Sequence, residues 1–276
     1  MRIINLIEDT AGREGCLYEH GLSFFVETKH HKLLVDTGAT DAFLSNAQTL
    51  GIDLRQIDTV ILSHGHYDHA GGILGFSKIN PNAKIYMQRT AVNDYYHKSE
   101  KMEKYIGIDK RIQYLPQIVF VDGDMAIDEE LFLFSGVSER KMWPAGNLDL
   151  KCKTEHGFVQ DRMDHEQYLV ISQDGKEILL SGCAHNGILN ILERYRELYG
   201  TDPDAVLSGF HMMRKSGYTD EDRAVIAATA QELKKTDTKF YTGHCTGREP
   251  FEMMHRIMGE QLLFVHSGEE ILTKTL

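Results

Sequence analysis

Short apolar runs, each ending in a small or polar residue, recur along the chain and predict β-strands. In the first third they occupy residues 3–7, 22–28, 32–38 and 59–63, and a further strand begins at residue 85. Between the third and fourth runs, Ala42, Phe43, Ala47 and Leu50 have helical spacing, and Gly51 is suited to end that helix. The first third is therefore predicted to be a sheet with a helix packed on it.

The last third alternates between strand and helix patterns. Strands are predicted at 167–173, 177–183, 204–210, 239–244 and 261–265, and helices at 187–200, 220–235 and 249–258. Apolar runs at 118–123 and 131–137 add two more strands. Early strands followed by late alternation predict two sheets with helices outside them.

Two middle segments do not follow either pattern. Residues 91–117 are polar and tyrosine-rich with helical stretches, which predicts a helical insertion or lid on a single domain that spans residues 1–276. Its Tyr95, Tyr96 and Tyr105 would line a pocket, contact a second subunit or complete the core. Residues 138–167 have no clear periodicity and are too long for a plain connection, which favours a functional loop or covering arm.

Composition and charge narrow the classes of partner. The 276 residues are 42% hydrophobic and 26% charged, as in an ordinary globular protein, and 30 Lys and Arg against 41 Asp and Glu give a net charge of -11. That charge disfavours nucleic acid and anionic membranes as partners. We therefore expect a small-molecule substrate. Whether the protein is a monomer or a homodimer stays open at this point. The chain lacks a long apolar run and an export signal at its start, so we expect a cytoplasmic protein with reduced cysteines.

Residues that bind metals follow four of the predicted strands. The strand ends read VILSHGHYDH, ILLSGCAH, AVLSGFH and FYTGHCTG. Loops at neighbouring strand ends converge on one site, because the sheet fixes where the loops begin. The residues that we expect to converge are His64, His66, Asp68, His69, Cys183, His185, His211 and His244.

The first of these loops carries four ligand-type residues within six positions, His64 to His69. Alternate spacing directs His64 and His66 to one side, and a turn at Tyr67 lets Asp68 and His69 face a second centre. Imidazole and carboxylate ligands suit zinc, iron or manganese, and their number exceeds what one tetrahedral ion uses. The loop therefore predicts two adjacent metal ions.

These motifs resemble the metallo-β-lactamase superfamily. The resemblance rests on H-x-H-x-D-H after a buried strand, on the upstream Asp36-Thr37-Gly38 and on the late Gly243-His244, and it covers the chain from about residue 22 onward. It implies an α/β fold, the four-layer αβ/βα sandwich, with a metal site at the edge between the sheets. By position, it assigns His64 and His66 to the first metal, Asp68, His69 and His244 to the second, and Asp36 to a hydrogen bond that orients the histidine loop.

The sequence departs from the common superfamily pattern at two places. The usual third histidine of the first metal is absent from residues 161–167, and Cys183 stands where many members have a bridging aspartate. The G-C-x-H and G-H-C-T-G loops are similar to a subgroup of metal-dependent hydrolases, some of them synthases of a ribofuranosylaminobenzene phosphate pterin precursor. That subgroup implies His185 as the missing ligand, with His156 and His165 as alternatives, and Cys183 as either a second-metal ligand or a small buried residue.

The resemblance implies a reaction as well as a site. Two divalent ions, zinc with manganese or iron as alternatives, would supply a bound hydroxide that attacks a carbonyl or phosphoryl centre. Asp68 would orient this nucleophile and accept its proton, and His211 would contact the substrate or serve in packing. The alternatives are a transferase or synthase of pterin-precursor metabolism and an iron-dependent redox enzyme.

Two features favour a small anionic substrate. Asn186 and Gly187 open a helix whose free N–H groups would face the metal pocket. The cationic residues Arg214, Lys215 and Arg248 follow two of the ligand loops.

Overall fold

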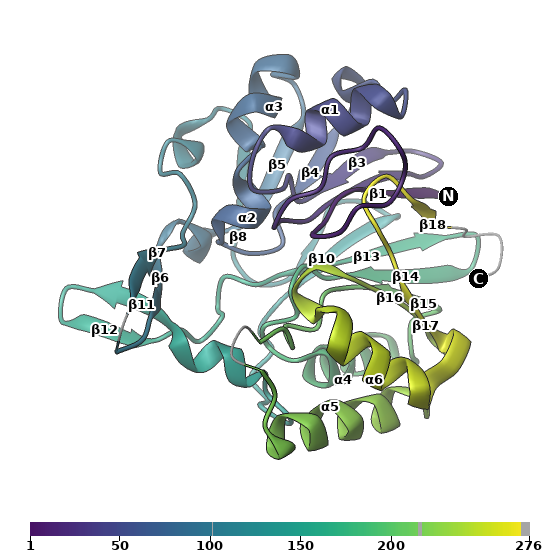
Figure 1. Ribbon diagram of the computed structural model, residues 1–276. Helices are drawn as coiled ribbons and strands as arrows, with labels where there is room; N and C mark the ends of the chain where they lie inside the picture. Colours follow the sequence, from purple (N-terminus) through teal and green to yellow (C-terminus); the bar gives the residue numbers. More distant parts are fainter. Residues whose placement is uncertain (101, 215–216, 272–276) are drawn as a thin grey trace.

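Two seven-stranded sheets face each other across the centre of the computed structural model, which describes residues 1–100, 102–214 and 217–271 (Figure 1). The N-terminal sheet has the order β18-β1-β2-β3-β4-β5-β8. Its strands are β1 (Arg2–Ile7), β2 (Ser23–Glu27), β3 (Lys32–Val35), β4 (Thr59–Ile61), β5 (Lys84–Gln88), β8 (Ile118–Val121) and β18 (Glu270–Ile271). The helices of this half are α1 (Ala42–Thr49), the short α2 (Tyr67–Ala70) and α3 (Ile73–Ile79), with 3-10 turns at η1 (Leu54–Gln56), η2 (Arg89–Val92) and η3 (Ile112–Tyr114).

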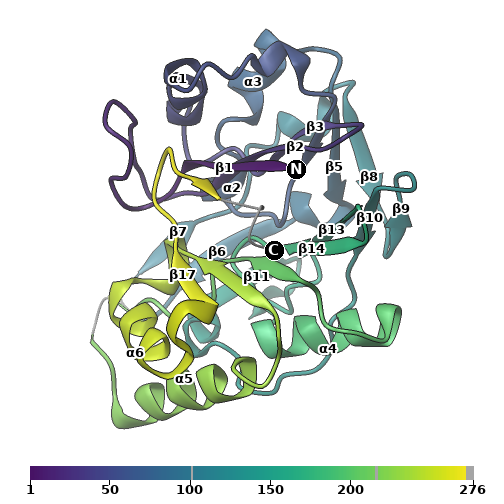
Figure 2. The same ribbon diagram turned by 90° about the vertical axis from the view of Figure 1, so that its right-hand side faces the viewer.

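The C-terminal sheet has the order β17-β16-β15-β14-β13-β10-β9. Its strands are β9 (Met125–Ala126), β10 (Leu131–Phe134), β13 (Tyr168–Gln173), β14 (Lys176–Leu180), β15 (Ala205–Leu207), β16 (Lys239–Thr242) and β17 (Leu262–Phe264). Helices α4 (Ile188–Tyr199), α5 (Asp220–Leu233) and α6 (Arg248–Met258) cover its outer face (Figure 2), and 3-10 turns lie at η4 (Ala145–Asp149), η5 (His244–Thr246) and η6 (Gly259–Gln261).

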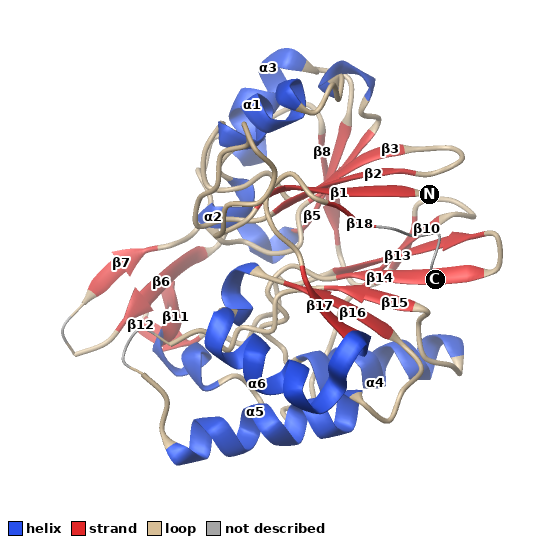
Figure 3. Ribbon diagram, turned by 45° about the vertical axis from the view of Figure 1, so that its right-hand side comes forward, coloured by secondary structure: helices blue, strands red, loops and turns tan. Residues whose placement is uncertain are grey.

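Both faces of each sheet are buried, and the alternation of side chains along the strands explains why. In β13, Leu169 and Ile171 join the core between the two sheets, whereas Tyr168 and Val170 pack beneath the C-terminal helices. In β3, Leu34 instead points to the N-terminal helices. The result is helix, sheet, sheet and helix in four layers (Figure 3), which confirms the predicted α/β sandwich.

The core between the sheets supplies a stability prediction. Leu169 is 0% exposed, so Leu169→Ala leaves a cavity among side chains of both sheets and should lower the free energy of unfolding by about 2–5 kcal/mol. The matched control is Leu148→Ala, which truncates a side chain that is 61% exposed and should change stability by less than about 0.5 kcal/mol. Urea unfolding monitored by circular dichroism compares them, and equal midpoints for the two variants would contradict this core assignment.

The segment 91–117 is not the helical insertion that its sequence suggested. It folds as strands β6 (Asp94–Lys98) and β7 (Glu103–Tyr105) with 3-10 turns, and β6 pairs with β11 (Leu150–Thr154), which in turn pairs with β12 (Gly157–Gln160). The resulting four-stranded sheet, β12-β11-β6-β7, stands out from one side of the sandwich (Figure 3). β7 pairs with β6 inside the segment, and β11 pairs with the other edge of β6. These strand pairings override the local helical pattern.

This small sheet is attached to the histidine loop. The Tyr67 N–H donates to the Ile106 carbonyl at 2.8 Å, and His66 forms an isolated bridge with Gly107. Of the tyrosines, Tyr95 is buried, with its ring centroid 4.0 Å from that of His165. The aperiodic segments at 91–117 and 138–167 are therefore one structural unit beside the predicted site.

The strand directions bring the candidate residues to one edge. Strands β3, β4 and β5 are mutually parallel, as are β14, β15 and β16, and β1 runs the same way as β3 because both are antiparallel to β2. Loops that follow parallel strands meet at the carboxyl edge of the sheet, where α/β proteins place their ligands. Within the described residues, no helix is both long enough and apolar enough to cross a membrane.

Candidate metal centre

The buried carboxylate of Asp36 orients the histidine loop, as the resemblance implied. Its Oδ1 accepts from the Ser63 N–H at 2.7 Å, and its Oδ2 accepts from Ser63 Oγ at 2.7 Å and from His69 Nδ1 at 2.6 Å. Ser63 Oγ lies 2.8 Å from His64 Nδ1, and it accepts from that ring because its own proton goes to Asp36. Both His64 and His69 therefore keep Nε2 free of a proton and available for a metal.

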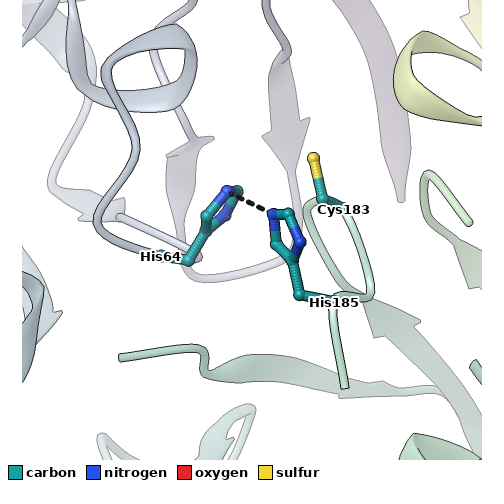
Figure 4. Close-up of side chains that lie close together, drawn as sticks. All are labelled: His64, Cys183 and His185. Carbon is teal, nitrogen blue, oxygen red and sulfur yellow. Dashed lines mark hydrogen bonds between the residues drawn. The ribbon is translucent and has the colours of Figure 1, made fainter. Parts of the chain in front are cut away.

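The rings of His64 and His185 lie side by side and point their Nε2 atoms towards each other (Figure 4). The amide oxygen of Asn147 accepts from His185 Nδ1 at 2.9 Å, so both rings expose Nε2, and the two Nε2 atoms lie 3.3 Å apart. Two ligand atoms each about 2.0–2.1 Å from one tetrahedral ion lie about 3.3–3.4 Å apart. Burial lowers the pKa of both imidazoles well below 6.5, which keeps them in the neutral form that binds metals.

Cys183 belongs to three groups of donor atoms, one of them with His211 and Cys245, and the other two contain the predicted metal ligands. Its sulfur, together with nitrogens of His64 and His185, forms a set whose atoms all lie within 4.8 Å of one another, and the same is true of Cys183, His69 and His244. Its Sγ lies 3.2 Å from His69 Nε2. Burial raises the pKa of the Cys183 thiol, so the thiolate needs a nearby cation. Because the Cys183 sulfur belongs to both groups of predicted ligands, it would suit a ligand shared by two metal ions.

Asp68 lies beside the second group, close to His69 and His244. Asp68 Oδ2 lies 3.6 Å from His244 Nε2 and 3.8 Å from His69 Nε2, and His244 Nδ1 lies 2.5 Å from Oδ1 of Asp9. Burial alone would raise the pKa of Asp68, but the imidazoles of His69 and His244 hold it well below its usual range. His244 Nε2 is buried without a hydrogen-bond partner, and a buried nitrogen of this kind suits a metal ligand.

His66 lies beside the first group with a buried, unpartnered Nε2. Its ring centroid is 4.6 Å from that of His64 and 4.8 Å from that of His185. Its donor atom groups most closely with those of Asp161 and His165, and its role as a first-metal ligand stays a prediction.

The two alternative ligands, His165 and His156, lie in different surroundings, and their roles as ligands stay predictions. His165 is buried, its Nδ1 accepts from the Gly65 N–H at 2.9 Å, and its Nε2 donates to Asp161 Oδ2 at 3.1 Å. Both ring nitrogens are thereby occupied. His156 is exposed in the turn that joins β11 and β12.

His211 lies next to the first group, at the end of β15. Its ring centroid is 4.1 Å from that of His185, and its Nδ1 has no partner. The backbone is strained there, since His211 and His244 both have φ of 48°, a region that non-glycine residues seldom adopt. The two alternative roles of His211, substrate contact and packing, stay predictions.

The predicted anion site at the start of α4 is already filled by the protein's own carboxylate. Glu166 Oε1 accepts from the His185 N–H at 2.7 Å, and Oε2 accepts from the Asn186 N–H at 2.9 Å and from the Tyr168 hydroxyl at 2.7 Å. The helix begins at Ile188, one residue after Gly187. These backbone donors hold Glu166, and Glu166 fixes the backbone of His185.

The cationic residues thought to attract an anion have other contacts. Arg214 forms an ion pair with Asp222 at 2.7 Å, and the guanidinium of Arg248 lies over the ring of Phe264 at 4.8 Å. Lys215 lies outside the described residues.

Sequence reasoning missed four side chains that support the site: Asp9, His20, Asn147 and Glu166. Asp9 follows β1, so its place at a strand end was a usable signal. Asn147 and Glu166 come from the aperiodic segment, where no spacing pattern marks them. His20 lies in an irregular loop.

The buried imidazoles predict how the metal-free protein responds to acid. Burial, with a contribution from His165, lowers the pKa of His66 to about 3, against 6.5 in an unfolded chain. Between these values the unfolded state binds the proton and the native state does not, so stability falls as pH decreases below 6.5. Relative to His66→Gln, the metal-free native chain should lose up to about 2 kcal/mol between pH 7.5 and pH 5. Thermal unfolding of both proteins across that range measures the difference, and parallel pH profiles would contradict the shift.

Comparison with known protein families adds to this geometry. The sequence profile of the metallo-beta-lactamase superfamily matches residues 19–147. A 7,8-dihydropterin-6-methyl-4-(beta-D-ribofuranosyl)-aminobenzene-5'-phosphate synthase of Methanocaldococcus jannaschii is 30% identical, over 98% of this chain and 96% of its own length. A second protein of that organism, the uncharacterized MJ0448, is 26% identical over 98% of this chain and 99% of its own.

Similar solved structures include a protein of the same superfamily. The crystal structure of Tm1679, a metal-dependent hydrolase of the beta-lactamase superfamily, has a TM-score of 0.82 and 29% identity, with 99% of both chains covered. Zn(2+)-bound PqqB of Methylobacterium extorquens has a TM-score of 0.60 at 14% identity, over 99% of this chain and 100% of its own, which shows a shared fold.

Proposed function

The chain belongs to the metallo-beta-lactamase superfamily, and we propose on that basis that it is a hydrolase that uses two divalent metal ions, most suitably zinc, on a small-molecule substrate. The observation that carries the proposal is the pair of donor groups that share Cys183. His64 and His185 would hold one ion, and Asp68, His69 and His244 the other. His66 is proposed as a further ligand of the first ion.

Bound ions of this kind lower the pKa of water and polarise the oxygen of the bond to be cleaved. Asp68 stays ionised at neutral pH because neighbouring imidazoles outweigh its burial, and its carboxylate would orient the attacking water. A carboxylate with a lowered pKa is a weak base. We therefore propose that Asp68 orients the attacking water and does not keep the proton that the water loses.

His211 would contact the substrate oxygen that gains negative charge. Its Nδ1 has no partner within the protein, and its ring packs against that of the ligand His185. A donor placed beside the reacting oxygen stabilises that charge as it develops.

The experiment that tests this function has two stages. Protein purified without added metal or chelator is first measured for metal content, and about two zinc or manganese ions per chain are expected. It is then incubated with esters, thioesters, lactones, amides and phosphodiesters, one compound at a time. One of these classes should be cleaved, and the rate of cleavage should rise with the metal content of the protein. A metal-loaded protein that cleaves none of them, or iron with redox turnover, would contradict the proposal.

A synthase is the second candidate, and the 30% identical relative favours it. A synthase joins two organic substrates, whereas a hydrolase consumes one organic substrate and water. Product analysis by mass spectrometry therefore separates them. A joined product formed only when both substrates are present would support the synthase.

A further inference from the structure

His20 lies at the outer side of the second donor group. Its Nε2 is 3.4 Å from Asp68 Oδ2, and its ring centroid is 5.0 Å from that of His244. The same Asp68 oxygen is 3.6 Å from His244 Nε2 and 3.8 Å from His69 Nε2. Three imidazole nitrogens thus surround one carboxylate oxygen.

These separations suit a shared cation better than hydrogen bonds. Hydrogen bonds from N–H to oxygen are about 2.7–3.2 Å long, and all three contacts are longer. Two ligand atoms on one tetrahedral ion lie about 3.3–3.4 Å apart, which is the separation of His20 Nε2 from Asp68 Oδ2.

Asp9 orients His20 and His244 in the same way. Its Oδ1 lies 2.5 Å from His244 Nδ1, and its Oδ2 lies 2.8 Å from His20 Nδ1. Each ring therefore donates its Nδ1 proton to this carboxylate and directs Nε2 towards Asp68. A carboxylate that holds the far nitrogen of a histidine is the usual support of a metal ligand. His20 has the same support as His244, which the superfamily resemblance already assigns to the second metal.

The loop that carries His20 is fixed against the site. The Glu19 side chain accepts from the backbone N–H groups of Ala39 at 2.9 Å and Thr40 at 3.0 Å. A Cβ on Gly21 would lie 2.8 Å from the Asp68 carbonyl oxygen, so only glycine allows this close approach. The Leu22 N–H donates to that same carbonyl at 3.2 Å. His20 is therefore held beside Asp68 by its own backbone.

From this geometry we propose that His20 is a further ligand of the second metal ion, on its solvent side, an assignment that rests on the proposed two-metal site. The His20 side chain is 48% exposed, whereas those of His69 and His244 are 0% exposed. An exposed ligand exchanges more readily than buried ones, so His20 is the ligand that a substrate would displace.

Cobalt(II) binding tests the assignment without a substrate. Native protein, His20→Ala and the control His156→Ala, which removes an exposed histidine of the β11–β12 turn, are titrated with Co²⁺ against a competing chelator. His20→Ala should weaken the more weakly bound Co²⁺ about tenfold or more, as loss of a metal-site partner does. Its visible absorption bands, which report coordination number, should change as well. His156→Ala should match the native protein in both.

The outcomes separate this proposal from the proposed function. If His20→Ala binds two Co²⁺ ions with native affinity and spectrum, His20 is only an ion-pair partner of Asp68 and Asp9, and this proposal alone fails. If the native protein binds no second Co²⁺, both fail. His20→Ala should fold normally by circular dichroism, because the His20 side chain is 48% exposed.

Discussion

Replacing His185 with alanine should reduce the metal content from two ions per chain towards one and remove turnover. His185 Nε2 lies 3.3 Å from His64 Nε2, and both belong to the donor group that includes Cys183. Without it, His64 and Cys183 remain from that group, with His66 as a proposed further ligand. The variant leaves the first ion one protein ligand short of the native set, so we expect this ion to be lost at ordinary concentrations. Elemental analysis of protein purified without added metal measures the loss.

Asn147→Ala is the matched comparison, because it removes only the group that orients His185. Its amide oxygen accepts from His185 Nδ1 at 2.9 Å, so the variant keeps the ligand nitrogen but frees the ring. Loss of such an outer partner costs about 10–100-fold in metal affinity or activity. Asn147→Ala should therefore recover two ions when metal is in excess, and His185→Ala should not. Equal metal content in native protein and His185→Ala would contradict the assignment of His185.

The sequence predicted most of the fold because each strand and helix carries its own local pattern. Alternate burial in β13, with Leu169 towards the other sheet and Tyr168 towards the helices, is an example in which pattern and packing agree. The helix prediction for residues 91–117 was wrong because β6 pairs with β7 on one side and with the distant β11 on the other. The pairing with β11 leaves no mark in the spacing of residues within the segment.

The sequence could predict candidate ligands that directly follow a strand. It could not predict the side chains in irregular segments that orient these ligands. The strand-end rule located His64, Cys183 and His244, because parallel strands deliver their loops to one edge. Asn147 and Glu166 lie in irregular chain, and only the folded structure brings them to His185. The sequence therefore indicates the candidate metal ligands, and the three-dimensional structure shows which side chains contact and orient them.

The helix start at residue 187 illustrates the same limit. Free N–H groups there predicted a site for an anionic substrate, which is the usual behaviour of a helix N-terminus. The chain instead places the carboxyl of Glu166 against the His185 and Asn186 N–H groups just before the helix, and burial raises the pKa of that carboxyl. The charge at a helix start depends on which side chain reaches it, and the substrate's charge stays open.

Cys183→Ala should have the largest effect on metal content, because its sulfur is the donor atom common to both groups. Removing it takes one ligand from each proposed ion, so both should be lost or greatly weakened, whereas His185→Ala removes a ligand from one. In Co²⁺-loaded native protein, a thiolate ligand also produces a near-ultraviolet charge-transfer band. That band should be absent from Cys183→Ala.

Cys183→Asp distinguishes a bridging ligand from a buried residue that merely fills space. Many members of the superfamily have a bridging aspartate at the corresponding position, so this variant should retain two ions yet lose the charge-transfer band. Cys152→Ala is the control, because its thiol lies in the small sheet and should contribute nothing to the spectrum. If the native protein lacked the band and Cys183→Ala kept two ions, the sulfur would not be a ligand, and the two centres would be held by histidine and aspartate alone. Loss of both ions from a folded Cys183→Ala, with both ions recovered in Cys183→Asp without the band, would instead support a thiolate that links the two centres.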